Sequence, residues 1–273
     1  MSWHGWSIQA PLLYVVVAAL LYWMGGQRAG TRRSEPRRAV SFAAGLVVIV
    51  LSLDSPIDGY AEQLFWVHML QHVLLITVAP PLLLLGRPWP RMWRALPLRT
   101  RTEVGRTLVR APFAAPVRRL ARPLPAFVLF TVTLLAWHLP GAYNATLSSP
   151  AIHQLEHATF FFTGLLFWAR VIDPGPLRPR LSWPWRIAYV VGAMSAGWLL
   201  AVILVLLPTP AYSHYALLTH RPGGLTAMTD QQLAGGVMWV LGSISYSIAM
   251  FIGFYRWLEP ERSTRPSMPA ITT

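Results

Sequence analysis

The stretch FWVHMLQHVLLITVAPPLLLL, residues 65–85, decides how this chain folds. It is long and apolar enough to cross a bilayer as one helix, because about 20 such residues span the hydrocarbon core. Two histidines, His68 and His72, lie near its beginning. Their four-residue spacing places both imidazoles on one helix face, with Cβ atoms about 5–6 Å apart. The stretch therefore predicts a membrane-spanning helix that carries a pair of imidazoles.

The composition of the whole chain agrees with a membrane protein. Of 273 residues, 54% are hydrophobic and 12% are charged, whereas soluble domains contain about 25% charged residues. All basic residues are arginine, so a retinal Schiff base, which needs a lysine, is excluded. Cysteine is absent, which excludes disulfides and thiolate ligands. The net charge of +13 is not accompanied by any nucleic-acid-binding motif, so we expect no nucleic-acid partner.

Seven apolar runs predict an all-α bundle of seven membrane-spanning helices in one domain, 1–273. The first run is interpreted as a retained span, because no basic residue precedes it as in a signal peptide. An arginine-rich cytoplasmic loop is expected at 86–124 and a cytoplasmic tail at 258–273. The seven spans are expected at about 8–25, 39–53, 65–85, 125–138, 153–170, 185–207 and 233–257.

The arginines fix the predicted orientation. They gather in the segments after the first, third, fifth and seventh runs, so these segments face the cytoplasm and the N-terminus lies outside. Every arginine except Arg221 then falls on the inner side. All eight histidines fall in the outer half, although neutral histidine is not subject to the positive-inside bias. The topology therefore predicts an imidazole cluster that faces the outside.

The helix breaks suggest where that cluster opens. The fourth run covers about 21 Å, against roughly 30 Å of hydrocarbon. Its outer end is therefore expected to stop below the membrane surface, so that His138 lies in a recess lined by an irregular segment, 139–150. In the third run Pro80 and Pro81 cannot donate backbone hydrogen bonds, so a kink is expected there, with Thr77 satisfying freed carbonyls.

A second histidine pair, His153 and His157, repeats the spacing of the first pair at the start of another apolar helix. Two such pairs at matched depth suggest a metal site, with Glu156 orienting or joining the ligands. The alternative is that the histidines form hydrogen bonds between helices. His138 is a candidate fifth ligand. Further candidate ligands or supporting residues on the outer side are Asp54, Met69, Met228, Asp230 and Met238, with Asp230 equally suited to cap the last span. His214 and His220 are expected to face solvent, and His4 is a further candidate on the outer side.

The sequence leaves the metal open. Imidazole-rich sites without thiolates suit copper, zinc, iron or nickel, and thioethers on the outer side favour copper. One histidine from each pair would alternatively clamp a b-type haem. No arrangement of serine and histidine indicates a catalytic triad, so we expect a protein that is not an enzyme.

Several segments resemble the CtaG-like family of assembly factors for caa-type cytochrome c oxidases. The resemblance rests on HMLQHVLLITVAPPLLLLGRP, WHLPGAYNATLSSPAIHQLEH, FFFTGLLFW and DQQLAGGVMW. It implies a multi-span protein of the bacterial plasma membrane, needed to mature a haem–copper oxidase at its copper stage. Its implied partners are oxidase subunits or other assembly factors, within membrane lipid. The family's histidines would correspond to His68, His72, His138, His153 and His157.

Three functions follow as hypotheses. The first is a copper-binding assembly factor with its site at the outer ends of the third, fourth and fifth spans. The second is a membrane oxidoreductase that binds haem or iron through the same histidines. The third is an assembly scaffold without a metal, whose histidines bond between helices and whose arginine-rich loop contacts oxidase subunits.

Overall fold

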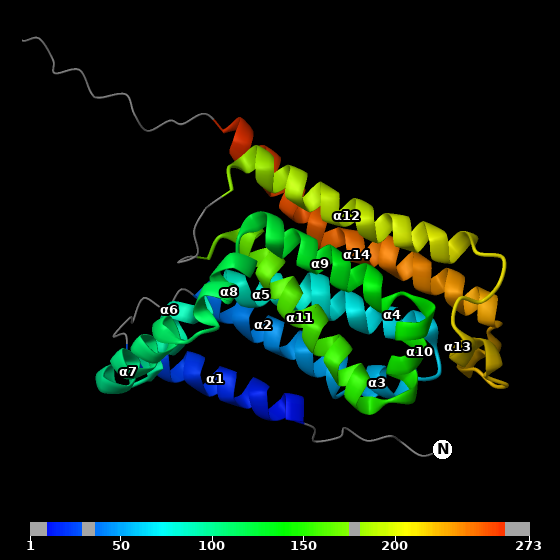
Figure 1. The fold of residues 1–273 in the computed structure, drawn as a ribbon, viewed down its shortest axis with the longest axis horizontal. Coiled ribbons are helices and arrows are strands. Elements are labelled where there is room, and N and C mark those ends of the chain that lie inside the picture. Colours follow the sequence, from blue (N-terminus) through cyan, green and yellow to red (C-terminus); the bar gives the residue numbers. More distant parts are fainter. Residues whose placement is uncertain (1–9, 29–35, 175–180, 260–273) are drawn as a thin grey trace, which may run out of the picture.

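A computed structural model describes residues 10–28, 36–174 and 181–259 of the chain (Figure 1). Every regular element in these ranges is a helix, which confirms the all-α class. Four helices are long and apolar enough to cross a membrane, and a fifth span results if two helices bent by 81° are counted together. These are α2 (Pro36–Leu53), the continuous helix Phe65–Leu85, α12 (Trp183–Leu206), α14 (Ala227–Leu258), and the bent pair α8 (Ala114–Leu120) and α9 (Pro123–Trp137).

Two further predicted spans correspond to helices outside that set. α1 (Ala10–Arg28) overlaps the run expected at 8–25. Its apolar stretch, Leu12–Arg28, is shorter than the 18 residues required of a candidate span. α11 (Pro150–Ile172) overlaps the run expected at 153–170 and carries two histidines and a glutamate in its first half. By length and composition, the described part of the chain contains four helices able to cross a membrane, or five if the bent pair is one span, and the number seven stays a prediction.

Some expectations concern residues outside the described ranges. His4 and the beginning of the first predicted span belong to residues 1–9, and most of the predicted cytoplasmic tail belongs to residues 260–273. The structure therefore says nothing about them.

The helix Phe65–Leu85 forms the centre of the molecule. Of its most apolar 18 residues 67% are buried, against 17–39% in the other three long helices. It consists of α4 (Phe65–Val73), a π-helical turn η1 (Leu74–Val78) and α5 (Ala79–Leu85). The prolines expected to kink this helix thus follow directly after a widened turn. Such π-helical turns inside α-helices occur frequently at functional sites.

The backbone carbonyls near the prolines find partners in the surrounding side chains. The indole Nε1 of Trp168 on α11 donates to the carbonyl of Ile76 at 2.9 Å, and the Thr77 hydroxyl donates to the carbonyl of Val73 at 2.8 Å. An unpaired carbonyl in hydrocarbon costs several kcal/mol, so the Trp168 bond stabilises the π-helical turn and fixes α11 against it.

Glycines allow the neighbouring helices to approach this centre closely. A Cβ atom on Gly164 of α11 would lie 3.2 Å from the Ile76 carbonyl oxygen and 3.3 Å from Cγ of Pro80. A Cβ atom on Gly45 of α2 would lie 2.8 Å from Cγ of Leu83. Small residues at such contacts are the usual means by which membrane helices pack. This packing sets the register that brings the two histidine pairs to the same height.

Helices also occupy the segment 139–150, which was expected to be irregular, and the segment expected to form the arginine-rich loop. The segment 139–150 forms α10 (Pro140–Ser148), whose Tyr143 is fully buried, because Pro140 suits the first turn of a helix. The expected arginine-rich loop forms α6 (Pro88–Ala95) and α7 (Leu98–Arg110), followed by α8.

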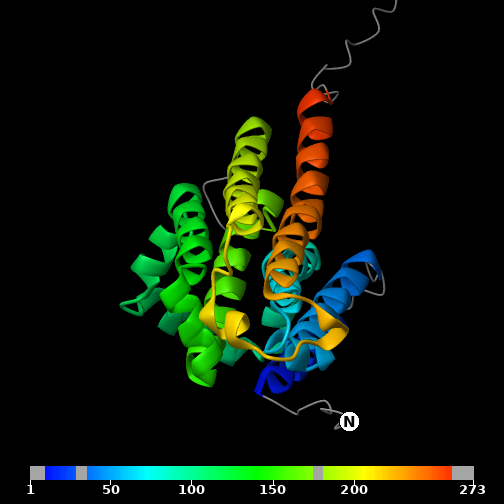
Figure 2. The ribbon, with the colours of Figure 1, turned by 90° about the vertical axis from the view of Figure 1, so that its right-hand side faces the viewer.

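The two ends of the bundle differ in chemistry. Figure 1 shows the arginine-rich α6, α7 and α8 at one end, and α10 and α13 (Ser213–Leu217) at the other. Figure 2, viewed from the end that bears α13, shows the connection between α12 and α14 (gold) running across the ends of the other helices. His68 of the first histidine pair contacts this connection, since its Nδ1 lies 3.0 Å from the hydroxyl of Tyr215 on α13.

Replacing Trp168 by phenylalanine tests the role of the π-helical turn. Trp168→Phe keeps an aromatic ring but leaves the Ile76 carbonyl without its donor, so we expect the free energy of unfolding to fall by about 1–3 kcal/mol. Thermal unfolding of the detergent-solubilised protein measures the loss. Trp185→Phe, at a site with 69% exposure, is the control and should change little. Equal melting temperatures for the two variants would contradict the account.

Candidate metal centre

Four side chains from two helices converge between α4 and α11. His68, His153, Glu156 and His157 each offer a ligand atom, and these atoms all lie within 4.8 Å of one another. His68 and Glu156 have no exposed surface, and His157 is 9% exposed. We call these four residues the histidine–glutamate cluster. Three imidazoles and a carboxylate form a donor set that suits a borderline transition-metal ion.

The carboxylate of Glu156 is the electrostatic focus of the cluster. Its Oε2 lies 3.7 Å from Nε2 of His68 and 3.7 Å from Nε2 of His72. Both carboxylate oxygens are buried without a hydrogen-bond partner among the described residues. A buried charge is stable only when it is paired or coordinates a metal. The cluster therefore needs a positive charge, which either a protonated imidazole or a bound cation would supply.

The hydrogen bonds of His68 determine which of its two ring nitrogens carries the proton. Its Nδ1 lies 3.0 Å from the hydroxyl of Tyr215, and that hydroxyl donates its proton to the Ala61 carbonyl at 2.6 Å. Burial is the main cause that raises the pKa of Tyr215 well above its usual value, so the hydroxyl keeps this proton. Nδ1 of His68 must then be the donor. In the neutral ring Nε2 carries the lone pair and points at a carboxylate, an arrangement that favours a cation between them.

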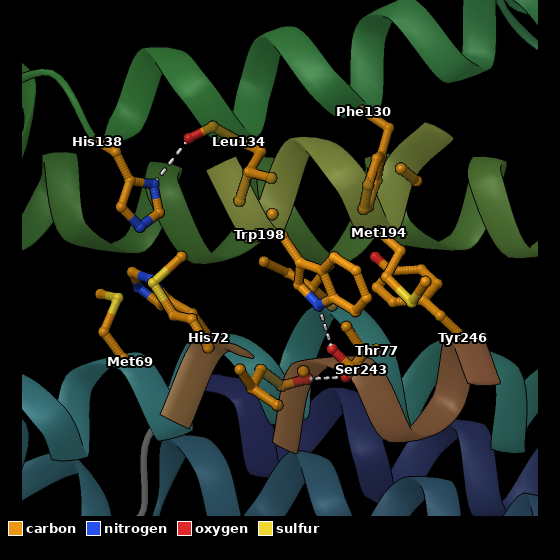
Figure 3. A pocket seen from close by; sticks show the side chains of 16 residues that line it. Met69, His72, Thr77, Phe130, Leu134, His138, Met194, Trp198, Ser243 and Tyr246 are labelled. Carbon is orange, nitrogen blue, oxygen red and sulfur yellow. Dashed lines mark hydrogen bonds between the residues drawn. The ribbon is translucent and has the colours of Figure 1, made fainter. Parts of the chain in front are cut away.

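His138 and His72 lie beside the cluster. His138 follows α9, and its Nδ1 donates to the Leu134 carbonyl at 2.8 Å, which leaves Nε2 buried without a partner among the described residues. Its ring centroid is 6.4 Å from that of His72. Both rings line a cavity of about 50 Å³ between α4, α9, α12 and α14 (Figure 3). The structure thus brings all five predicted histidines together, three in the cluster and two at the cavity next to it.

Asp230 supports the helix that carries the first histidine pair. Its Oδ2 and Oδ1 accept hydrogen bonds from the backbone amides of Phe65 and Trp66, each at 3.0 Å, at the start of α4. The cap of its own helix is Thr226, whose hydroxyl accepts from the amide of Thr229. Asp230 therefore caps α4 rather than α14, and it is not one of the four cluster residues.

Gln71 fixes the same helix on its other side. Its amide nitrogen donates to the Ser52 carbonyl at 2.7 Å and to Oδ1 of Asp58 at 2.8 Å. Burial raises the pKa of Asp58, and the hydrogen bond from Gln71 acts in the opposite direction. These bonds tie α4 to the end of α2 and to α3 (Pro56–Ala61), so that the imidazoles of α4 are held from both sides.

The remaining candidates lie outside the cluster. Asp54 is buried at the end of α2, and Met69 is fully buried and lines the cavity. His220 is exposed, and Nε2 of His214 lies 3.2 Å from the Glu62 carbonyl. Sequence reasoning missed Tyr215, because nothing in the spacing connects it with His68, 147 positions away.

Comparison with known proteins identifies the family. The family model described as cytochrome c oxidase caa3 assembly factor matches residues 13–260, so the chain belongs to that family. This confirms the resemblance seen in the sequence. No solved structure matches the chain.

Curated mycobacterial proteins are also similar. An uncharacterised protein of Mycobacterium bovis and one of Mycobacterium tuberculosis are each 26% identical over 233 residues, and one of Mycobacterium leprae is 23% identical over 230 residues. Each alignment covers 82% of this chain and 34% of the relative. The chain therefore spans about a third of the length of these relatives.

Substitution of Asp230 tests its role as the cap of α4. Asp230→Ala removes both acceptors, so we expect a loss of about 0.5–2 kcal/mol in the free energy of unfolding. Asp230→Asn keeps one oxygen and should lose less. Denaturation in detergent measures both, with Gln232→Ala at an exposed position of the same helix as the control. A stability of Asp230→Ala equal to that of the control would rule out this role.

Proposed function

We propose that this chain binds copper at the histidine–glutamate cluster while a cytochrome c oxidase is assembled in a bacterial plasma membrane. Its family supplies the pathway, since the matching model describes caa3 oxidase assembly factors. One observation supports a bound metal ion: the carboxylate of Glu156 is fully buried among imidazoles and has no hydrogen-bond partner among the described residues. A histidine that only joins two helices would form hydrogen bonds through its ring nitrogens. Nε2 of His68, His153 and His157 is buried without a hydrogen-bond partner among the described residues.

Copper fits these donors better than the other candidate metals. The chain has no cysteine, so the donors available are imidazole, carboxylate and thioether. Zinc, iron and nickel also accept imidazole and carboxylate, but thioether ligands such as those lining the adjacent cavity select copper in its reduced form. In this proposal copper is cargo that the chain holds or hands on, and the chain performs no catalytic step.

Different residues would balance the charge of the ion, orient its ligands and fix the helices that carry them. Glu156 balances the charge in a region of low dielectric constant. Tyr215 holds His68 in the tautomer that presents Nε2 to the ion. Asp230 fixes the start of α4, which carries His68. The contact between Gly164 and the π-helical turn places the ligands of α11 opposite those of α4.

A haem is the less supported alternative. Ring centroids of neighbouring histidines in the cluster lie 4.2 Å apart for His153 and His157 and 5.1 Å apart for His68 and His153. The adjacent cavity has a volume of about 50 Å³. Pockets that hold a cofactor or a drug-sized ligand usually have a volume of about 300–1,000 Å³, so this cavity is too small for a haem. An absorption spectrum of the purified protein separates the alternatives, because a haem enzyme would show a Soret band.

Substitution of the cluster tests the proposal. Glu156→Gln removes the charge without changing the size of the side chain, and we expect it to weaken copper binding by at least about tenfold. The double variant His68→Ala/His153→Ala removes two ligands and should weaken binding further. Copper retained after loading and desalting is the measurement, and Glu103→Gln, an exposed glutamate on α7, is the matched control. If the copper content of both cluster variants equalled that of the control, the site assignment would be wrong.

The proposal includes seven spans, with the N-terminus and the cluster on the outer side. Because the chain contains no cysteine, single introduced cysteines report topology without background. A membrane-impermeant maleimide should label Glu62→Cys, exposed after α3, in intact cells. It should label Arg106→Cys, exposed on α7, only after the cells are permeabilised. Labelling of Arg106→Cys in intact cells would reverse the orientation.

A further inference from the structure

The cavity beside the cluster has walls that combine imidazoles with thioethers. Its volume is about 50 Å³, whereas a single water needs only about 10–15 Å³. Most of its lining is apolar, including Val73, Phe130 and Leu134. The exceptions that offer metal donors are two histidines and three methionines: His72, His138, Met69, Met194 and Met238.

The two imidazoles are placed to share one ion. Nδ1 of His138 is used by the Leu134 carbonyl, so Nε2 carries the lone pair of the neutral ring. Figure 3 shows the Nε2 edge of His138 facing the ring of His72 across the cavity. The ring centroids are 6.4 Å apart, and with metal–nitrogen bonds of about 2 Å this leaves room for one ion between the two rings. Both side chains are more than nine-tenths buried.

Two hydroxyls of the cavity wall, those of Ser243 and Thr77, are hydrogen-bonded within the protein, and the lining also includes the phenol of Tyr246. The Ser243 hydroxyl accepts a hydrogen bond from Nε1 of Trp198 at 2.6 Å and donates to the Trp239 carbonyl. The Thr77 hydroxyl donates to the Val73 carbonyl. None of the described residues lining the cavity is acidic. Neutral nitrogen and sulfur donors in apolar surroundings favour a soft monovalent ion over a hard or strongly hydrated one.

We propose that this cavity is a second copper position, selective for Cu(I), in which His138, His72 and methionine thioethers hold the ion. It extends the proposed function and rests on it for the role of the chain in holding copper, whereas the preference for Cu(I) comes from the thioethers of the cavity itself. The position adjoins the cluster through His72, whose Nε2 lies 3.7 Å from Oε2 of Glu156 while its ring lines the cavity. The chain would then hold Cu(I) among neutral ligands beside a cluster that contains a carboxylate.

X-ray absorption spectroscopy of the wild-type protein loaded anaerobically with Cu(I) tests the proposal without any substitution. Because the chain contains no cysteine, a sulfur neighbour of copper must be a methionine. We expect such a neighbour together with imidazole nitrogens. A spectrum with nitrogen and oxygen neighbours alone would overturn the proposal.

Substitution then identifies the sulfur. The triple variant Met69→Leu/Met194→Leu/Met238→Leu conserves side-chain volume, the kind of change that cores tolerate best. It should lose the sulfur neighbour and weaken Cu(I) binding, measured by competition with bicinchoninate, at least about tenfold. Met250→Leu, packed against the core outside the cavity, is the matched control and should keep both. A sulfur neighbour retained in the triple variant would overturn the assignment.

The cluster variants separate this proposal from the preceding one. A protein carrying Glu156→Gln and His153→Ala should still bind Cu(I) with a sulfur neighbour, because neither residue lines the cavity. Loss of the sulfur signal in that protein would overturn an independent second position. If copper content were unchanged by these substitutions but the sulfur signal present in the wild type, the cluster assignment would fail and the cavity assignment would stand.

Discussion

The helices that meet at the candidate metal centre are held around a carboxylate that is buried among imidazoles. Glu156 has no exposed surface and lies 3.7 Å from one nitrogen of His68 and one of His72. Such a charge would destabilise a membrane bundle unless a cation compensated it. The surrounding contacts hold the compensating groups in place: Trp168 and Gly164 fix α11 on the π-helical turn, and Asp230 and Gln71 fix both sides of α4.

The site divides into two environments of different chemistry. The cluster combines imidazoles with a negative charge, whereas the cavity offers imidazoles and thioethers without an acidic residue among its described lining. His72 adjoins both.

Much of this arrangement could be predicted from the sequence, because local spacing determines it. The four-residue separation of His68 and His72, repeated by His153 and His157, fixes each pair on one helix face whatever the tertiary fold. The apolar runs predicted helices in the same way. What the sequence did not predict depends on contacts between distant segments. Asp230 was expected either to ligate or orient histidines or to cap its own helix, and it caps α4 instead. Tyr215 lies 147 positions from the histidine that it orients.

Multi-element analysis of the purified wild-type protein shows which metal the chain binds. Copper, iron, zinc and nickel are measured together per polypeptide after solubilisation in detergent and after loading with Cu(I) and Cu(II). We expect stoichiometric copper that exceeds the other three metals. Protein that retains no copper after both loadings, or that retains iron in its place, would contradict this expectation.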